Sequence, residues 1–213
     1  MTETVSHLTE VQLKTLNAFK QHVHQKLLAL PSSHHTESLA YCTEACLARY
    51  LKARDWDMKQ SLKLLSSSIE WRQKTQPHNI RASDLTFEAT SGKTYRRGFA
   101  RSGRPVIYLT PSRENSTNYE KNLQLIVYTV ERAIESMENG IEKLVLIVDF
   151  NDFSTKVQPP LYVCKEMINI ISNHYPERLG DCYIVDAPFI FNMLWKAIKP
   201  FINSATRAKL HFV

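Results

Sequence analysis

Strand-like and helical patterns alternate from residue 144 to the end of the chain, and this alternation constrains the fold most. Leu144–Val148 is a continuous apolar run with helical patterns on both sides, which is typical of a buried parallel strand. The elements predicted after it are a helix over 160–173, a strand over 182–185, a helix over 189–198 and a strand over 209–213. Strands that alternate with helices form parallel sheets, so this region predicts an α/β fold.

The helix predicted over residues 189–198 is apolar on almost every side, and Pro200 ends it. A helix with this pattern must be buried or must face lipid. It is too short to span a bilayer, which needs about 20 apolar residues. We therefore expect it to cover an apolar surface.

The N-terminal third of the chain has a different character, because its first 75 residues carry helical patterns and no strand signal. Strand patterns begin after Pro77, in a hairpin predicted to turn at Ser102-Gly103. The sequence therefore predicts two domains, a small all-helical unit over residues 1–76 and an α/β unit over residues 77–213.

The net charge of +6 and the pI near 9.1 favour an acidic partner, either an anionic membrane surface or a nucleic acid. A modest excess of solvated Lys and Arg explains the same charge equally well. The N-terminus is polar and acidic, unlike a secretory signal, and no apolar run is long enough to span a bilayer. We expect a cytoplasmic protein with reduced cysteines.

Motifs for catalysis and cofactor binding are absent from the sequence. With 5 glycines the chain holds no glycine-rich phosphate loop, and it has no GxSxG or HExxH motif. Cys42 and Cys46 fit core thiols of an amphipathic helix better than zinc ligands. Asp149 and Asp152 follow the buried strand, where loop caps are commoner than ligand-binding carboxylates. We expect no enzyme, no metal and no cofactor.

A basic run over residues 93–104 mixes Lys and Arg with Tyr95 and Phe99. Such a pattern can bind single-stranded nucleic acid by charge and stacking. Its strand-like alternation instead favours a hairpin with a solvated outer face, with Tyr95 and Phe99 turned inward. We prefer the hairpin and expect no nucleic acid partner.

Residues 175–209 carry four motifs in order, namely YPERLG, YIVDAPFIF, WKxIKPF and NSATxxK. Together they closely resemble the signature of CRAL-TRIO domains, in particular the yeast-type phosphatidylinositol/phosphatidylcholine transfer proteins. Residues 47–57 with Trp71-Arg72 are similar to the small N-terminal helical domain of that family. Gly103–Val106 with Tyr108 resembles its G-R-P-V strand. The resemblance covers roughly residues 40–213.

The resemblance implies that the chain binds one phospholipid in an enclosed apolar pocket and transfers it between membranes. The pocket would have a sheet as its floor, helices as its walls and a mobile gate helix. The implied headgroup-binding residues are Arg54, Glu177, Thr206 and Lys209. The residues expected to line or cover the pocket are Tyr108, Phe189, Phe191, Leu194, Trp195 and Ile198.

Phosphatidylinositol is the expected ligand, because Leu144–Leu146 lacks the small hydroxyl residues of phosphatidylcholine-binding members. A carrier of a sterol, retinoid or tocopherol, and a membrane-targeting or interaction module without transfer activity, are the alternatives. Family members continue for several tens of residues past the strand at Val213, so the resemblance implies a C-terminally short domain. We expect a monomer that contacts anionic membranes transiently and peripherally.

Overall fold

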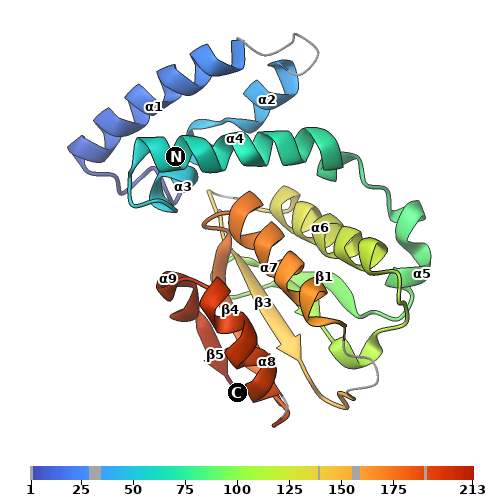
Figure 1. Cartoon of the computed structure of the whole chain (residues 1–213). Coiled ribbons are helices and arrows are strands. Elements are labelled where there is room, and N and C mark those ends of the chain that lie inside the picture. Colours follow the sequence, from blue (N-terminus) through green and yellow to red (C-terminus); the bar gives the residue numbers. More distant parts are fainter. Residues whose placement is uncertain (1, 29–34, 139, 155–158, 190) are drawn as a thin grey trace. The chain divides into compact units, whose positions relative to one another are not determined.

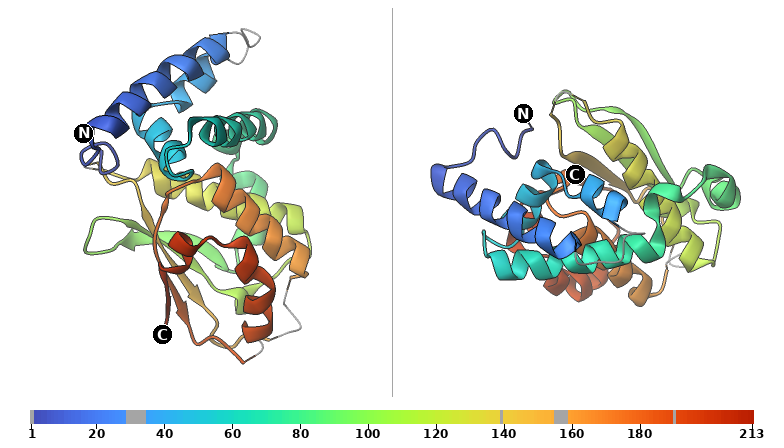
Figure 2. Two further views of the ribbon diagram at one scale, coloured as in Figure 1. Left: turned by 60° about the vertical axis from the view of Figure 1, so that its left-hand side comes forward. Right: turned by 90° about the horizontal axis from the view of Figure 1, so that it is seen from above.

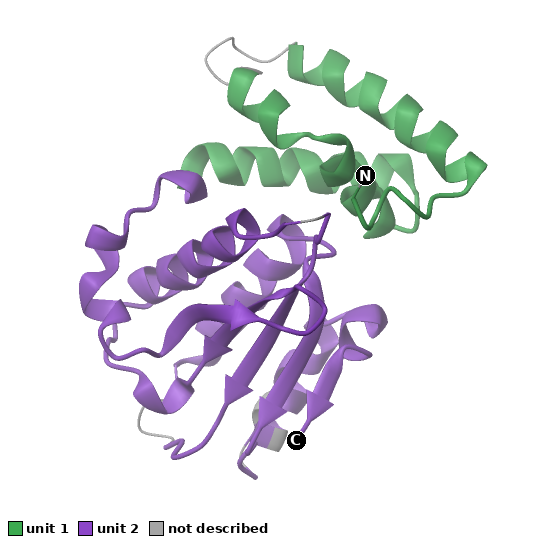
Figure 3. Ribbon diagram, turned by 180° about the vertical axis from the view of Figure 1, so that it is seen from behind, with its two compact units in different colours: residues 1–76 green, residues 77–213 purple. Residues whose placement is uncertain are grey.

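The computed structural model describes residues 2–28, 35–138, 140–154, 159–189 and 191–213. The chain forms two compact units, residues 1–76 and residues 77–213, which Figure 3 colours separately. Figure 1 labels the helices and strands.

Unit 1 (residues 1–76) contains helices and no strand in its described residues, as predicted. Its helices are α1 (Glu10–Leu28), α2 (His35–Tyr41), α3 (Glu44–Lys52) and α4 (Met58–Thr75). Asp57 caps α4 by accepting a hydrogen bond from the backbone N–H of Gln60 at 2.9 Å. The core of the unit consists of buried side chains from α1, α3 and α4, among them Leu16, Phe19, Leu47, Leu51 and Leu65.

Unit 2 (residues 77–213) contains a five-stranded sheet and the helices that connect its strands. The strands are β1 (Thr94–Phe99), β2 (Pro105–Leu109), β3 (Leu144–Asp149), β4 (Leu179–Val185) and β5 (Leu210–Phe212). The helices are α5 (Thr86–Ala89), α6 (Tyr119–Glu135), α7 (Leu161–His174), α8 (Phe191–Ile198) and α9 (Ser204–Arg207). Short 3-10 helices occupy residues 77–79, 82–85, 111–113 and 199–201.

The strands lie in the order β1-β2-β3-β4-β5, so neighbours in the sequence are neighbours in the sheet. The β1–β2 pair is antiparallel and the other three pairs are parallel, which confirms the predicted mainly parallel α/β fold. Right-handed crossovers that all advance in one direction place their helices on the same face of a sheet. Figure 2 shows α6, α7 and α8 on that one side.

The opposite face of the sheet carries a row of cross-strand neighbours. Successive partners in this row are Tyr95, Tyr108, Ile147, Tyr183 and His211. The Tyr95 and Tyr108 rings are stacked with centroids 5.1 Å apart, and the Tyr183 and His211 rings with centroids 4.9 Å apart. Cys182 and Ile184, on either side of Tyr183, pack with Phe191 of α8. Alternate residues of a strand point to opposite faces, so the row that contains Tyr183 lies away from α8.

The prediction that Phe99 turns inward is wrong, because its side chain is 52% exposed and the Arg96 guanidinium lies 4.5 Å from the centre of its ring. The β1–β2 register shifts between Arg96 and Phe99, and Gly98 has a φ of 67° there. A bulge of this kind reverses the alternation of the residues after it. Tyr95 precedes the shift and is half-buried.

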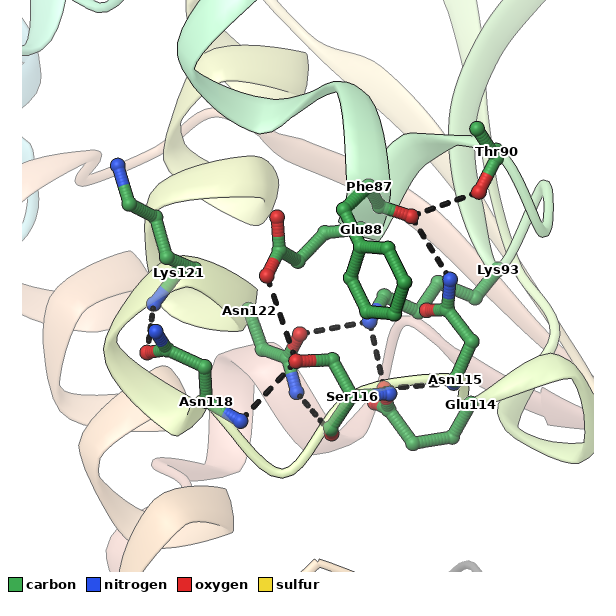
Figure 4. A network of polar contacts seen from close by, with 10 residues as sticks. All are labelled: Phe87, Glu88, Thr90, Lys93, Glu114, Asn115, Ser116, Asn118, Lys121 and Asn122. Atoms are coloured by element: carbon green, nitrogen blue, oxygen red, sulfur yellow. Dashed lines mark hydrogen bonds and ion pairs between the residues drawn. The ribbon is translucent and has the colours of Figure 1, made fainter.

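A buried polar network fixes the connection between β2 and α6 (Figure 4). The Lys93 ammonium, 5% exposed, donates hydrogen bonds to Glu114 Oε1 at 2.5 Å and Asn122 Oδ1 at 2.6 Å. The same Glu114 oxygen accepts the backbone N–H groups of Asn115 and Ser116 at 3.0 and 2.9 Å. One ammonium therefore ties the start of β1 to the loop and to the first turn of α6.

Candidate functional site

Helix α8 packs against the sheet through an aromatic cluster. Phe191 is 7% exposed, and its ring centroid lies 5.0 Å from that of Phe150 and 6.1 Å from that of Phe212. The Trp195 ring lies 5.9 Å from Phe212 and 6.3 Å from Phe191. Cys182 and the neighbouring apolar residues of β3 and β4 complete this buried cluster. Helix α8 is therefore buried on its sheet-facing side by contacts between apolar rings.

The predicted pocket residues occupy several different environments. Phe191 and Trp195 lie in the aromatic cluster, and Ile198 is buried at the end of α8. Phe189 precedes the helix and is 89% exposed. The side chain of Leu194 lies outside the described residues.

Tyr108 lies apart from that cluster. It pairs with Ile147, which pairs with Tyr183, and this row occupies the face of the sheet opposite to α8. The structure therefore does not bring Tyr108 to the residues of α8.

Three of the four predicted headgroup residues lie at one end of the sheet. Strands β4 and β5 are parallel with Cys182 opposite Leu210, so Lys209 lies level with Asp181, and Glu177 lies four residues earlier toward the same end of the sheet. Glu177 precedes β4, and Thr206 and Lys209 precede β5. The Cys182 N–H donates to the Lys209 carbonyl at 2.8 Å, and the Lys209 N–H donates to the Thr206 carbonyl at 3.1 Å. This end of the sheet therefore carries the Glu177 carboxylate, the Thr206 hydroxyl and the Lys209 ammonium.

The turn that carries Glu177 has an uncommon backbone geometry. Glu177 has a φ of 58°, in the left-handed region that few residues other than glycine adopt. The next residue, Arg178, holds the turn in place because its guanidinium donates to the Glu142 carbonyl at 2.8 Å. The Arg178 carbonyl accepts the Leu144 N–H at 2.8 Å. A strained backbone held by its surroundings is common at binding sites.

The fourth predicted headgroup residue, Arg54, belongs to unit 1 and follows α3. Its Nη1 donates to the Ala53 carbonyl at 2.8 Å. Asp55 and Trp56, which follow it, have φ values of 49° and 66° and turn the chain into α4. Arg54 thus belongs to unit 1, whereas Glu177, Thr206 and Lys209 belong to unit 2.

A polar contact that sequence reasoning missed fastens the edge strand β5. The Asp181 carboxylate accepts hydrogen bonds from Arg104 Nη1 at 3.2 Å and lies 3.0 Å from His211 Nε2. A Cβ on Gly180 would lie 2.9 Å from the same Arg104 Nη1 and 3.1 Å from the Leu144 carbonyl oxygen. A side chain at Gly180, the glycine of the YPERLG motif, would therefore displace the Arg104 guanidinium and press on the Leu144 backbone.

Cysteine chemistry in the described residues is governed by burial. All four cysteines are free, and burial raises the pKa of Cys42 to about 12, with the neighbouring Cys46 adding to the effect. No group of three or more His, Cys, Asp or Glu side chains that could hold a metal ion occurs in the described parts of the chain. In the same residues no helix is both long and apolar enough to cross a bilayer.

The Cys182 thiol gives a direct test of burial beneath α8. Burial raises its pKa from 9.0 to about 12, so we expect no alkylation at pH 8 while unit 2 is folded. The folded state holds this proton more tightly than the unfolded state, so its contribution to stability is present below pH 9.0 and is lost as the pH rises toward about 12. Pulsed alkylation followed by peptide mass spectrometry measures the rate. Modification as fast as that of a small-molecule thiol would contradict this burial.

Comparison with known proteins assigns the chain to a family. The family model described as CRAL/TRIO domain matches residues 89–213, and the model described as CRAL/TRIO, N-terminal domain matches residues 15–67. The chain belongs to the CRAL/TRIO family. Members of the CRAL/TRIO family are lipid-binding proteins.

Two curated CRAL/TRIO relatives illustrate the range of the match. A CRAL-TRIO domain-containing protein of Schizosaccharomyces pombe is 33% identical over 172 residues, which are 81% of this chain and 17% of the relative. The phosphatidylinositol transfer protein PDR17 of Saccharomyces cerevisiae is 29% identical in an alignment of 184 residues that covers 81% of this chain and 53% of the relative. The chain thus spans about half of PDR17 and a smaller part of the other relative.

The CRAL/TRIO fold is also evident from a solved structure. The crystal structure of Sfh5 superimposes on this chain with a TM-score of 0.74 and 15% sequence identity, covering 96% of this chain and 80% of Sfh5. At this identity the match establishes the fold.

Proposed function

We propose that this chain binds a phospholipid, phosphatidylinositol, and transfers it between membranes. The proposal rests on polar residues at the end of the sheet where β4 and β5 begin and on the apolar face of α8 that covers these strands. Glu177, Thr206 and Lys209 lie at the edge where β4 and β5 begin, and α8 lies along the same two strands with Phe191 and Trp195 toward the sheet. The yeast relative PDR17, a phosphatidylinositol transfer protein, supports this choice of ligand.

The chemistry of the edge fits an inositol phospholipid. The Lys209 ammonium supplies the positive charge that a phosphodiester requires. The Glu177 carboxylate and the Thr206 hydroxyl can bond the hydroxyl groups of the inositol ring. Phosphatidylcholine has no such hydroxyls, and its choline offers no hydrogen-bond donor for these two groups. The edge therefore favours an inositol headgroup.

The wall of α8 supplies the apolar environment for the acyl chains. Moving a phospholipid through water would expose its acyl chains at a cost of about 0.8 kcal/mol per CH₂ group. An enclosed apolar space removes most of this cost. We propose that Phe191, Trp195 and Ile198 move from the sheet to contact the acyl chains, so that transfer requires opening and closing of α8 rather than bond chemistry.

A face of unit 2 next to α8 is suited to membrane contact. Lys165 of α7 lies 4.8 Å from the centre of the Phe201 ring, which joins α7 to the segment after α8. Tyr162, Met193 and Phe201 are 63%, 64% and 55% exposed. Lys196 and Lys199 are exposed on the same segment. Exposed apolar side chains among lysines are typical of surfaces that insert into anionic bilayers.

Replacing Met193 and Phe201 together by serine should lower binding to anionic vesicles by about tenfold or more, because each inserted apolar side chain stabilises the bound state by about 1.5–3 kcal/mol. Vesicle cosedimentation measures the effect. The control replaces Val11 and Phe87, which are 73% and 63% exposed elsewhere, by serine and should leave binding unchanged. If both double variants lose the same amount of vesicle binding, the face formed by α7 and α8 is not the membrane-contacting surface.

Vesicle-to-vesicle transfer tests the function as a whole. Donor vesicles carry radiolabelled phosphatidylinositol or a labelled neutral ligand such as tocopherol, and acceptor vesicles carry neither. We expect the protein to accelerate phosphatidylinositol transfer and to leave the neutral ligand unaffected. Faster transfer of the neutral ligand would identify a different cargo, and binding without transfer would identify a membrane-targeting module.

A further inference from the structure

We propose that unit 1 carries a second ligand site, a groove between α1 and α4 that binds a compact ligand with two or more phosphate groups. This site is separate from the lipid site proposed for unit 2 and is formed by residues of unit 1 alone. The groove has a volume of about 470 Å³. The groove is shallow and largely open to solvent.

Three lysines give the groove its charge. Lys26 comes from the last turn of α1, and Lys59 and Lys63 come from the first two turns of α4. All three are exposed, and none has a hydrogen bond or an ion pair with another described residue. Lys59 and Lys63 are four residues apart, a spacing at which like charges on a helix repel each other. An anion held between these ammonium groups would remove that repulsion.

Two other lysines of unit 1, unlike those of the groove, are paired with carboxylates. Lys14 lies 2.8 Å from a carboxylate oxygen of Glu10, and Lys20 lies 3.7 Å from one of Glu44. These exposed pairs neutralise their lysines locally. The uncompensated positive charge on α1 and the start of α4 is therefore concentrated at the groove.

The remaining lining residues define the kind of anion. Leu62 packs against the core of unit 1 and lies between the two α4 lysines in the sequence. Ser66 and Ser67 follow Lys63 by one turn and supply hydroxyl donors. Glu70 lies two turns beyond Lys63, about 10 Å along the helix axis, and limits the anionic ligand to the lysine end. Lysine binds phosphate as a point charge, so three of them suit several phosphates rather than one planar carboxylate.

Two sources of this chemistry exist, a soluble inositol polyphosphate and the headgroup of a polyphosphorylated lipid. Isothermal titration with inositol hexakisphosphate tests the first source. Cosedimentation with phosphatidylcholine vesicles that contain phosphatidylinositol bisphosphate tests the second. Binding in either assay supports the site and identifies its source, and binding in neither overturns the proposal.

Matched variants of the full chain separate the groove from general surface charge. The groove variant Lys26→Gln/Lys59→Gln/Lys63→Gln should bind the active probe about tenfold or more weakly, because it loses the charge-assisted contacts. The control Lys14→Gln/Lys20→Gln/Lys74→Gln removes the same charge from the same unit and should change affinity less than about twofold. Equal losses in the two variants would overturn the proposal.

A variant that is expected to bind the probe more tightly distinguishes loss of the site from misfolding, because a misfolded protein would not gain affinity. Glu70→Gln removes the carboxylate found among the described lining residues and should raise affinity for the probe, whereas Glu10→Gln should not. An unchanged affinity in Glu70→Gln would contradict the geometry. Phosphatidylinositol transfer by the groove variant should equal that of the unmodified protein, so failure of this site and failure of the proposed transfer function are distinguishable.

Discussion

Replacing Lys209 by alanine should lower the rate of phosphatidylinositol transfer by about 10- to 100-fold, because a hydrogen bond to a charged group contributes about 1.5–3 kcal/mol. The alanine variant leaves the lipid phosphate beside the β4–β5 edge without that ammonium. Transfer from labelled vesicles to unlabelled acceptors measures the loss. The backbone bonds of Lys209 to Cys182 and Thr206 do not involve its side chain, so β5 should remain paired.

Two comparisons make the Lys209 result specific. Lys121→Ala removes the same charge from α6 and should leave phosphatidylinositol transfer within about twofold of the unmodified protein. Binding of a neutral ligand to the Lys209 variant should also be unchanged. If the variant loses phosphatidylinositol and neutral ligands equally, Lys209 has a structural role and the headgroup assignment fails.

Replacing Lys93 by methionine should lower the free energy of unfolding of unit 2 by about 3–5 kcal/mol, because removing one member of a buried ion pair leaves the other without compensation. Glu114 would keep its charge beside Asn122 with its ammonium partner gone. Urea unfolding followed by Trp195 fluorescence, with the two tryptophans of unit 1 replaced by phenylalanine, measures the change.

The double variant Lys93→Met/Glu114→Gln is the control for this network. It removes both charges, so it should be more stable than Lys93→Met alone. A single variant that loses less than about 1 kcal/mol would show that the pair in Figure 4 contributes little net stability.

The sequence predicted the mainly parallel sheet well, because local patterns determine where its strands lie. Leu144–Val148 is a continuous apolar run, and the helical patterns beside it favour a parallel strand over a buried helix. The structure buries Leu144 and Val145 and leaves the rest of the strand half-buried. The start of α8 at Phe191 instead of residue 189 is a boundary difference of the usual size. By contrast, the outward position of Phe99 depends on a bulge in β1 that the local alternation does not reveal.

Motif and topology together place part of the candidate site, whose role stays a prediction. Glu177 and Lys209 precede adjacent parallel strands and so lie toward the same end of the sheet, which the alternation already implied. The face on which Tyr108 lies depends on cross-strand register, and shifting the register by one residue reverses it. Lys26 and Lys59 line the groove of unit 1 from two different helices, an arrangement that no spacing along the chain indicates.

Native mass spectrometry of the purified protein, followed by lipid extraction, tests the central claim most directly. We predict one phospholipid bound per chain, identified as phosphatidylinositol, with occupancy greatly reduced in the Lys209→Ala variant. A monomer that purifies without lipid and does not take up phosphatidylinositol from vesicles would contradict the claim. So would a bound sterol, retinoid or tocopherol that phosphatidylinositol does not displace.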